Sequence, residues 1–102
     1  MEEVKIVGFA DGALQISLSG DIDLGNAEAF YQTVMAGYQE NKGNVVFECS
    51  ALNFIDSTTL GTFVKILKAV KSDGHTMRLT GLQAKIKKLF LICSLDSIMQ
   101  LD

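Results

Sequence analysis

The sequence predicts an α/β fold in which helices pack against a mixed β-sheet. Three observations predict it. Strand-like and helix-like hydrophobic patterns alternate along the 102 residues, the first two strand patterns are joined by a tight turn, and no repeat or linker interrupts the series. Because 48% of the residues are hydrophobic, the chain can bury a core of its own. We therefore expect one domain over residues 1–102.

The segment 4–20 is typical of two strands that meet at Asp11-Gly12, a dipeptide that favours tight hairpin turns. Its second half alternates between apolar and polar residues, which predicts a half-buried strand. After Gly25, apolar residues recur at helical spacing, and residues 41–44 end that pattern. The stripe of this predicted helix consists of Ala27, Phe30, Tyr31, Val34, Met35 and Tyr38.

The short apolar run at 45–47 predicts a central strand that is covered on both faces. A second helix follows, ended by Gly74, and residues 76–80 alternate like a strand. A third helix comes next, and residues 97–101 are a candidate for a last short strand. The apolar stripes of these two helices are Leu60, Phe63, Val64, Leu67 and Val70, and then Ile86, Leu89, Phe90 and Cys93.

Charge and cysteine content limit the partners that we expect. The net charge is −3 and the only cluster of lysines is Lys85, Lys87 and Lys88, so nucleic acid is not an expected partner. Cys49 and Cys93 have no metal-binding spacing, and we expect both to be buried, reduced thiols. The acidic start does not resemble a signal peptide, and no segment has the ~20 apolar residues needed to span a bilayer. A cytoplasmic protein without a membrane partner is therefore predicted.

Four polar residues, Asp56-Ser57-Thr58-Thr59, stand between a predicted strand and a predicted helix. Helix capping by Asp56 or Ser57 explains one of them, because a side-chain oxygen there accepts hydrogen bonds from first-turn amides. Capping does not explain four in a row at the edge of a sheet, where functional sites of α/β proteins usually lie. A hydroxyl at a helix N-terminus also suits phosphorylation, since the free amides accommodate an anion.

The segment FECSALNFIDSTTLGTFV resembles the signature of the STAS domain, and specifically that of small bacterial anti-sigma factor antagonists. In that signature an acid-x-Ser segment precedes Phe-Ile-Asp-Ser and Leu-Gly. The matching residues here are Glu48, Ser50, Phe54, Ile55, Asp56, Ser57, Leu60 and Gly61. An upstream element, residues 20–23, resembles the Gly-acid-hydrophobic-Asp element of the same family. Together with the order of elements, the resemblance covers essentially the whole chain.

This resemblance implies a partner switch. An unphosphorylated antagonist binds an anti-sigma factor that is also a serine kinase, and thereby releases a sigma factor. The kinase phosphorylates the residue that corresponds to Ser57, and a metal-dependent serine phosphatase reverses the modification. The family commonly has Gly at the position of Thr59 and Asp at that of Glu48, and the adjacent hydroxyls leave Thr58 or Thr59 as an alternative acceptor. The partner-binding residues that we expect are Asp21, Asp23, Asp56, Ser57, Thr58, Thr59 and Gly61.

Three other hypotheses come from the same residues. A hydrolase with Ser57 as nucleophile needs a nearby base, but the only histidine, His75, lies about 25 Å away at the far end of the predicted helix. A metal site made of Asp21, Asp23 and Asp56 is less expected, because Asp-rich turns are mostly caps and no EF-hand spacing is present. A scaffold or small-ligand sensor is the third hypothesis. We expect no enzyme activity, no metal and no cofactor.

Overall fold

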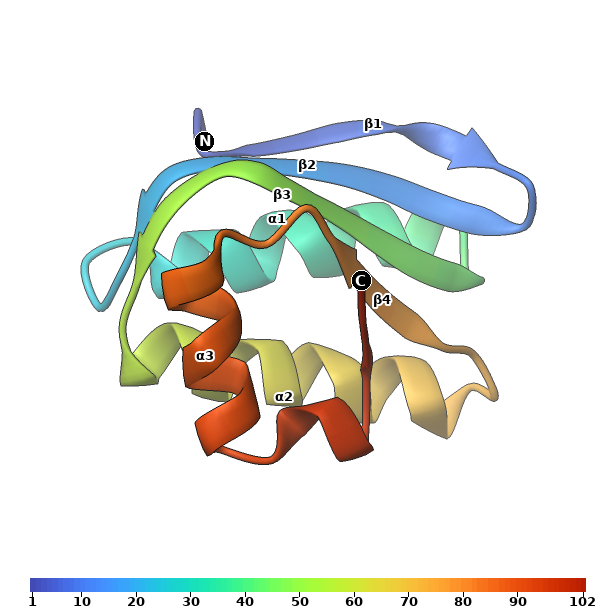
Figure 1. Cartoon of the computed structure of the whole chain (residues 1–102). Helices are drawn as coiled ribbons and strands as arrows, with labels where there is room; N and C mark the ends of the chain where they lie inside the picture. Colours follow the sequence, from blue (N-terminus) through green and yellow to red (C-terminus); the bar gives the residue numbers. More distant parts are fainter.

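The computed structural model describes all 102 residues and contains one five-stranded mixed sheet, with its strands in chain order (Figure 1). The first two strands are antiparallel, and each later pair is parallel. The strands are β1 (Val4–Ala10), β2 (Ala13–Ile22), β3 (Asn44–Ile55), β4 (Met77–Thr80) and β5 (Gln100–Leu101). The helices are α1 (Ala27–Glu40), α2 (Ser57–Ser72), α3 (Ala84–Ile92) and the 3-10 turn η1 (Leu95–Ser97). The predicted fold class is therefore confirmed, including the last strand.

The β1–β2 turn follows from the Asp11-Gly12 dipeptide. Both residues have positive φ angles, 56° and 76°, which a two-residue hairpin turn with the right twist requires. Glycine adopts this conformation without strain, and aspartate is among the residues that tolerate it best. The hairpin is therefore determined locally by the sequence.

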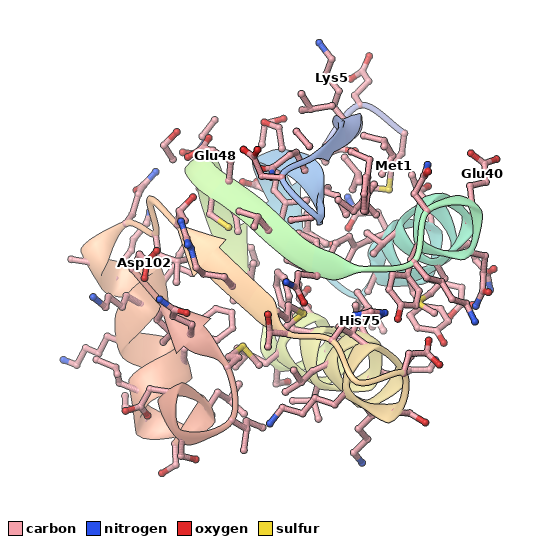
Figure 2. All side chains as sticks on the ribbon, turned by 90° about the vertical axis from the view of Figure 1, so that its right-hand side faces the viewer. Met1, Lys5, Glu40, Glu48, His75 and Asp102 are labelled. Atoms are coloured by element: carbon pink, nitrogen blue, oxygen red, sulfur yellow. The ribbon has the colours of Figure 1, made fainter.

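One face of the sheet is covered by helices, and the other face is open. Along β3, Val45 and Phe47 are buried, Val46 is half-buried and Glu48 is exposed. Figure 2 shows Glu48 on the side of the sheet away from α1 and α2, which lie next to each other against its inner face. The prediction that the strand is covered on both faces was wrong. The prediction failed because three apolar residues in a row occur in both kinds of strand. One kind is covered on both faces, and the other is covered on one face and has an apolar residue on its open face.

The core is centred on Phe63 of α2. Its ring makes edge-to-face contacts with Phe30 of α1, Phe47 of β3 and Phe90 of α3, at centroid distances of 5.1, 5.4 and 5.4 Å. All four rings are fully buried. Phe63 thus joins the three helices to the central strand, and edge-to-face pairs of this kind add to the free energy gained by burial.

The third helix differs from its prediction at two positions. Ile86 and Phe90 are buried as expected, but Leu89 and Cys93 are exposed. Because α3 ends at Ile92, Cys93 no longer follows the helical period that predicted its burial. Cys49 is buried, as predicted, and burial raises the pKa of its thiol to about 12.

A hydrogen bond joins the ends of α1 and α2. The buried Tyr38 hydroxyl donates to Asp73 Oδ2 at 2.7 Å, and Lys42 Nζ lies 3.7 Å from the same oxygen. The Tyr38 bond lowers the pKa of Asp73. Burial, with Asp73 as a second cause, raises the pKa of Tyr38 to about 12.

We expect Tyr38→Phe to lower the free energy of unfolding by about 1 kcal/mol at neutral pH, because one hydrogen bond is lost and its acceptor, Asp73, is exposed to solvent that screens its charge. Since the pKa of Asp73 is lowered on folding, its contribution is present above pH 3.8 and is lost as the pH falls through the lower, folded value. The raised pKa of Tyr38 keeps the hydroxyl protonated until the pH approaches about 12. Urea unfolding of both proteins should show a difference at pH 7 that shrinks as the pH falls below 3.8. A difference that stays equal as the pH is lowered would contradict this account.

Candidate functional site

The predicted site lies where β2 and β3 end, at the left of Figure 1. The last residues of these two parallel strands, Ile22 and Ile55, are register partners. Each strand is followed by a short loop and a helix, so the 23–26 loop before α1 lies beside Asp56 and the first turn of α2. The register of two strands therefore brings the two predicted motifs together.

Asp56 connects the two loops through both of its carboxylate oxygens. It caps α2, since Oδ1 accepts a hydrogen bond from the Thr59 amide at 3.0 Å. Oδ2 accepts a bond from the Leu24 amide at 2.9 Å, across 32 residues of sequence. The Thr59 amide, followed by the Leu24 amide, lowers the pKa of Asp56. Asp56 therefore stays ionised at neutral pH.

Thr59 is completely buried. Its hydroxyl lies 2.6 Å from the Ile22 carbonyl oxygen, to which it donates, and 3.0 Å from Asp56 Oδ1. Thr59 is therefore not exposed on the partner surface as expected, and its hydroxyl is covered and already hydrogen-bonded. The physical reason is that the first turn of α2 directs this side chain towards the end of β2, where the hydroxyl satisfies a buried carbonyl group.

The neighbouring residues are accessible. Ser57 and Thr58 are exposed on the first turn of α2, and Gly61 is exposed one turn further on. A Cβ atom added to Gly61 would meet nothing within 4 Å, so the fold itself does not require glycine at this position. Asp21 is exposed and Asp23 is half-buried. The predicted site residues thus lie at the ends of β2 and β3 and in the first turns of α2, and Thr59 is the one that is fully buried.

The 23–26 loop is held by its own polar side chains. Asp23 Oδ1 accepts a bond from the Gly25 amide at 2.9 Å, and Asn26 Oδ1 accepts one from the Asp23 amide at 2.8 Å. Asn26 Nδ2 donates to the Asp21 carbonyl oxygen at 3.0 Å. Sequence reasoning missed Leu24 and Asn26. A polar residue directly before a helical pattern could have marked Asn26, although its side chain bonds within the loop and does not cap α1.

An apolar groove lies beside this surface, between the end of β3 and α3. It is lined by Asn53, Phe54, Ile55, Lys85, Ile86 and Leu89. Phe54 and Leu89, two of its apolar residues, are large and partly exposed. The exposed surface at this end of the sheet therefore combines carboxylates, hydroxyls and apolar side chains.

The structure does not support a metal site or a Ser–His pair here. Asp21, Asp23 and Asp56 do not converge, and no group of three acidic, cysteine or histidine side chains is placed to hold a metal ion. His75 lies beyond the far end of α2, whose 16 residues separate it from Ser57 by about 24 Å. His75, labelled in Figure 2, is half-buried. No helix has the length and apolar character needed to cross a membrane.

Comparison with known proteins identifies the family. The sequence model of the STAS domain matches residues 5–102. An anti-sigma-B factor antagonist of Bacillus subtilis is 27% identical over 89 residues, which are 87% of this chain and 81% of that protein. A crystal structure of a putative anti-sigma factor antagonist from Thermotoga maritima superimposes with a TM-score of 0.84 at 24% identity, over 96% of this chain and 82% of that one. The phosphorylated form of the Bacillus cell-fate determinant SpoIIAA gives a TM-score of 0.75 at 16% identity, over 97% and 90%. This chain belongs to the STAS domain family.

Proposed function

We propose that this protein is an anti-sigma factor antagonist that is switched by phosphorylation of Ser57. In its unmodified form it binds an anti-sigma factor that is also a serine kinase, and a sigma factor is released. Phosphorylation of Ser57 ends the complex, and a metal-dependent serine phosphatase restores it. The observation that carries the proposal is the exposed Ser57 hydroxyl at the start of α2, next to the capping carboxylate of Asp56.

The local chemistry supports Ser57 as a phosphate acceptor. The first turn of a helix has amides without intrahelical partners, and the helix dipole favours an anion at that end. An exposed serine there can enter the active site of a kinase without unfolding of the chain. The names of the relatives support the same role, because they are anti-sigma factor antagonists.

The proposed role is regulatory and not enzymatic. Ser57 has no histidine within reach to act as a base, and the predicted partner surface is an edge of the sheet and not a cleft around a nucleophile. The rest of the docking surface would consist of Asp21, Asp23, Asp56, Thr58 and Gly61. No cofactor is assigned to it.

We expect incubation with a cognate kinase and ATP to add one phosphoryl group, and we expect Ser57→Ala to abolish the addition. Thr58→Ala is the matched control, because Thr58 is the other exposed hydroxyl in the same turn and its loss should leave the modification in place. Intact-protein mass spectrometry with phosphopeptide mapping measures both. Modification at Thr58 in the unsubstituted protein would assign the acceptor to the neighbouring residue. Binding without any modification would favour the scaffold hypothesis.

A further inference from the structure

We propose that Leu24 is an apolar anchor of the docking surface and that it inserts into an apolar pocket with a basic rim on the partner protein. Leu24 is the most exposed large hydrophobic residue of the chain, with 75% of its surface accessible. It follows Asp23 in the loop that borders Ser57. The inference rests on the proposed function and adds to it the chemistry of the partner surface.

The backbone of Leu24 is fixed although its side chain is exposed. The Leu24 amide donates to Asp56 Oδ2 at 2.9 Å, which ties this residue to the cap of α2. The adjacent Gly25 amide is bonded to Asp23 Oδ1, and Asn26 holds both ends of the loop. Because the backbone is already held, binding through Leu24 costs little backbone conformational entropy, which favours this residue as an interface anchor.

Asp56 also sets the position of Leu24 relative to the phosphate acceptor. One oxygen of the carboxylate caps the helix that Ser57 begins, and the other holds Leu24. The anchor and the acceptor therefore keep a fixed separation. A partner that places its catalytic groups over Ser57 meets Leu24 in the same orientation each time.

The charges around Leu24 define the pocket that it fits. Four carboxylates lie in the 23–26 loop or directly beside it, and none of them forms an ion pair within the chain. They belong to Asp21, Asp23, Glu28 and Asp56. Of the three lysines of α3, Lys85 lines the neighbouring groove beside Phe54 and Ile55, and Lys87 and Lys88 follow it along α3. An acidic surface around an apolar side chain is complementary to an apolar pocket surrounded by lysine or arginine.

The test measures affinity for the purified serine kinase of the anti-sigma class, from the same genome, that phosphorylates Ser57 in the assay above. We expect Leu24→Ser and Leu24→Ala to weaken binding at least tenfold and Leu24→Met to retain it. Ile92→Ser is the matched control, because Ile92 of α3 is also highly exposed (68%) and should not affect binding. Melting temperatures should stay unchanged, since the side chain of Leu24 packs little within the chain.

Ionic strength separates the two parts of the proposed contact. Added salt should weaken binding of the wild-type protein, because it screens the acidic rim. The ratio between wild-type and Leu24→Ser affinities should persist, because burial of an apolar side chain is not screened. If Leu24→Ser bound the kinase with the same affinity as the wild-type protein, the proposal that Leu24 is an anchor would be wrong. Absence of binding and phosphorylation by every such kinase would instead overturn the proposed function, and the anchor with it.

Discussion

Phosphorylation of Ser57 should weaken the complex with the anti-sigma factor by about 100-fold or more and leave the fold intact. A phosphoserine adds about −1.5 to −2 charge at neutral pH. It does so next to Asp56, whose pKa is lowered by the Thr59 amide and which is therefore already ionised. The phosphate adds bulk and negative charge at the point where the kinase, which itself holds the phosphates of ATP, must approach Ser57. Steric exclusion and repulsion across the interface should cost several kcal/mol, and 2.7 kcal/mol corresponds to about 100-fold. The helix should remain, because its first-turn amides and dipole tolerate the anion.

Titration calorimetry with the kinase, and amide spectra of the free protein, measure these two effects separately. Ser57→Asp has less charge and volume than phosphoserine, so it should weaken binding only in part, and Ser57→Ala should retain binding. Spectral changes should stay near residues 21–25 and 54–62, where the Asp56 hydrogen bonds join the two loops. Changes throughout the sheet, or an unchanged affinity, would contradict a local switch.

Phe63→Ala should lower the free energy of unfolding by about 3–5 kcal/mol, the largest effect on stability that we expect of a single substitution. The ring is fully buried and contacts Phe30, Phe47 and Phe90, so its removal leaves a cavity where three helices meet the central strand. Domains of this size are typically stable by only about 5–15 kcal/mol. The variant should therefore be close to its unfolding transition at physiological temperature.

Urea unfolding followed by circular dichroism measures this loss. Phe63→Leu is the matched control, because it leaves a smaller cavity than alanine while it also removes the edge-to-face contacts, and it should cost clearly less than Phe63→Ala. A loss in Phe63→Ala no greater than that in Phe63→Leu would contradict the central role of this ring.

The order of elements was predictable because it depends on local patterns. Each local pattern indicates one feature of one element. The alternation over residues 14–18 indicates β2, the apolar stripe before residue 41 indicates α1, and the glycine at 74 marks the end of α2. The Asp11-Gly12 turn has the backbone angles that its residue types favour. The family signature around Asp56-Ser57 was likewise visible in consecutive residues.

Patterns at the ends of elements were less informative. Cys93 has helical spacing from Phe90 and Leu89 but lies beyond the last residue of α3, so the spacing does not determine its environment. Val46 is apolar but lies on the open side of the sheet. The spacing of apolar residues identifies those that share one face of a helix or strand. It does not show whether another element covers that face.

The sequence by itself determined the α/β fold class, the order of its strands and helices, and the position of a polar motif at the start of a helix. Only the tertiary structure decided which of the adjacent hydroxyls is accessible, Ser57 and Thr58 remaining exposed while Thr59 is buried against the Ile22 carbonyl. It also decided that Asp56 holds Leu24, 32 residues away in sequence. The physical reason is that these contacts depend on the register of β2 against β3, which is set by packing of the whole sheet and not by the residues of either loop.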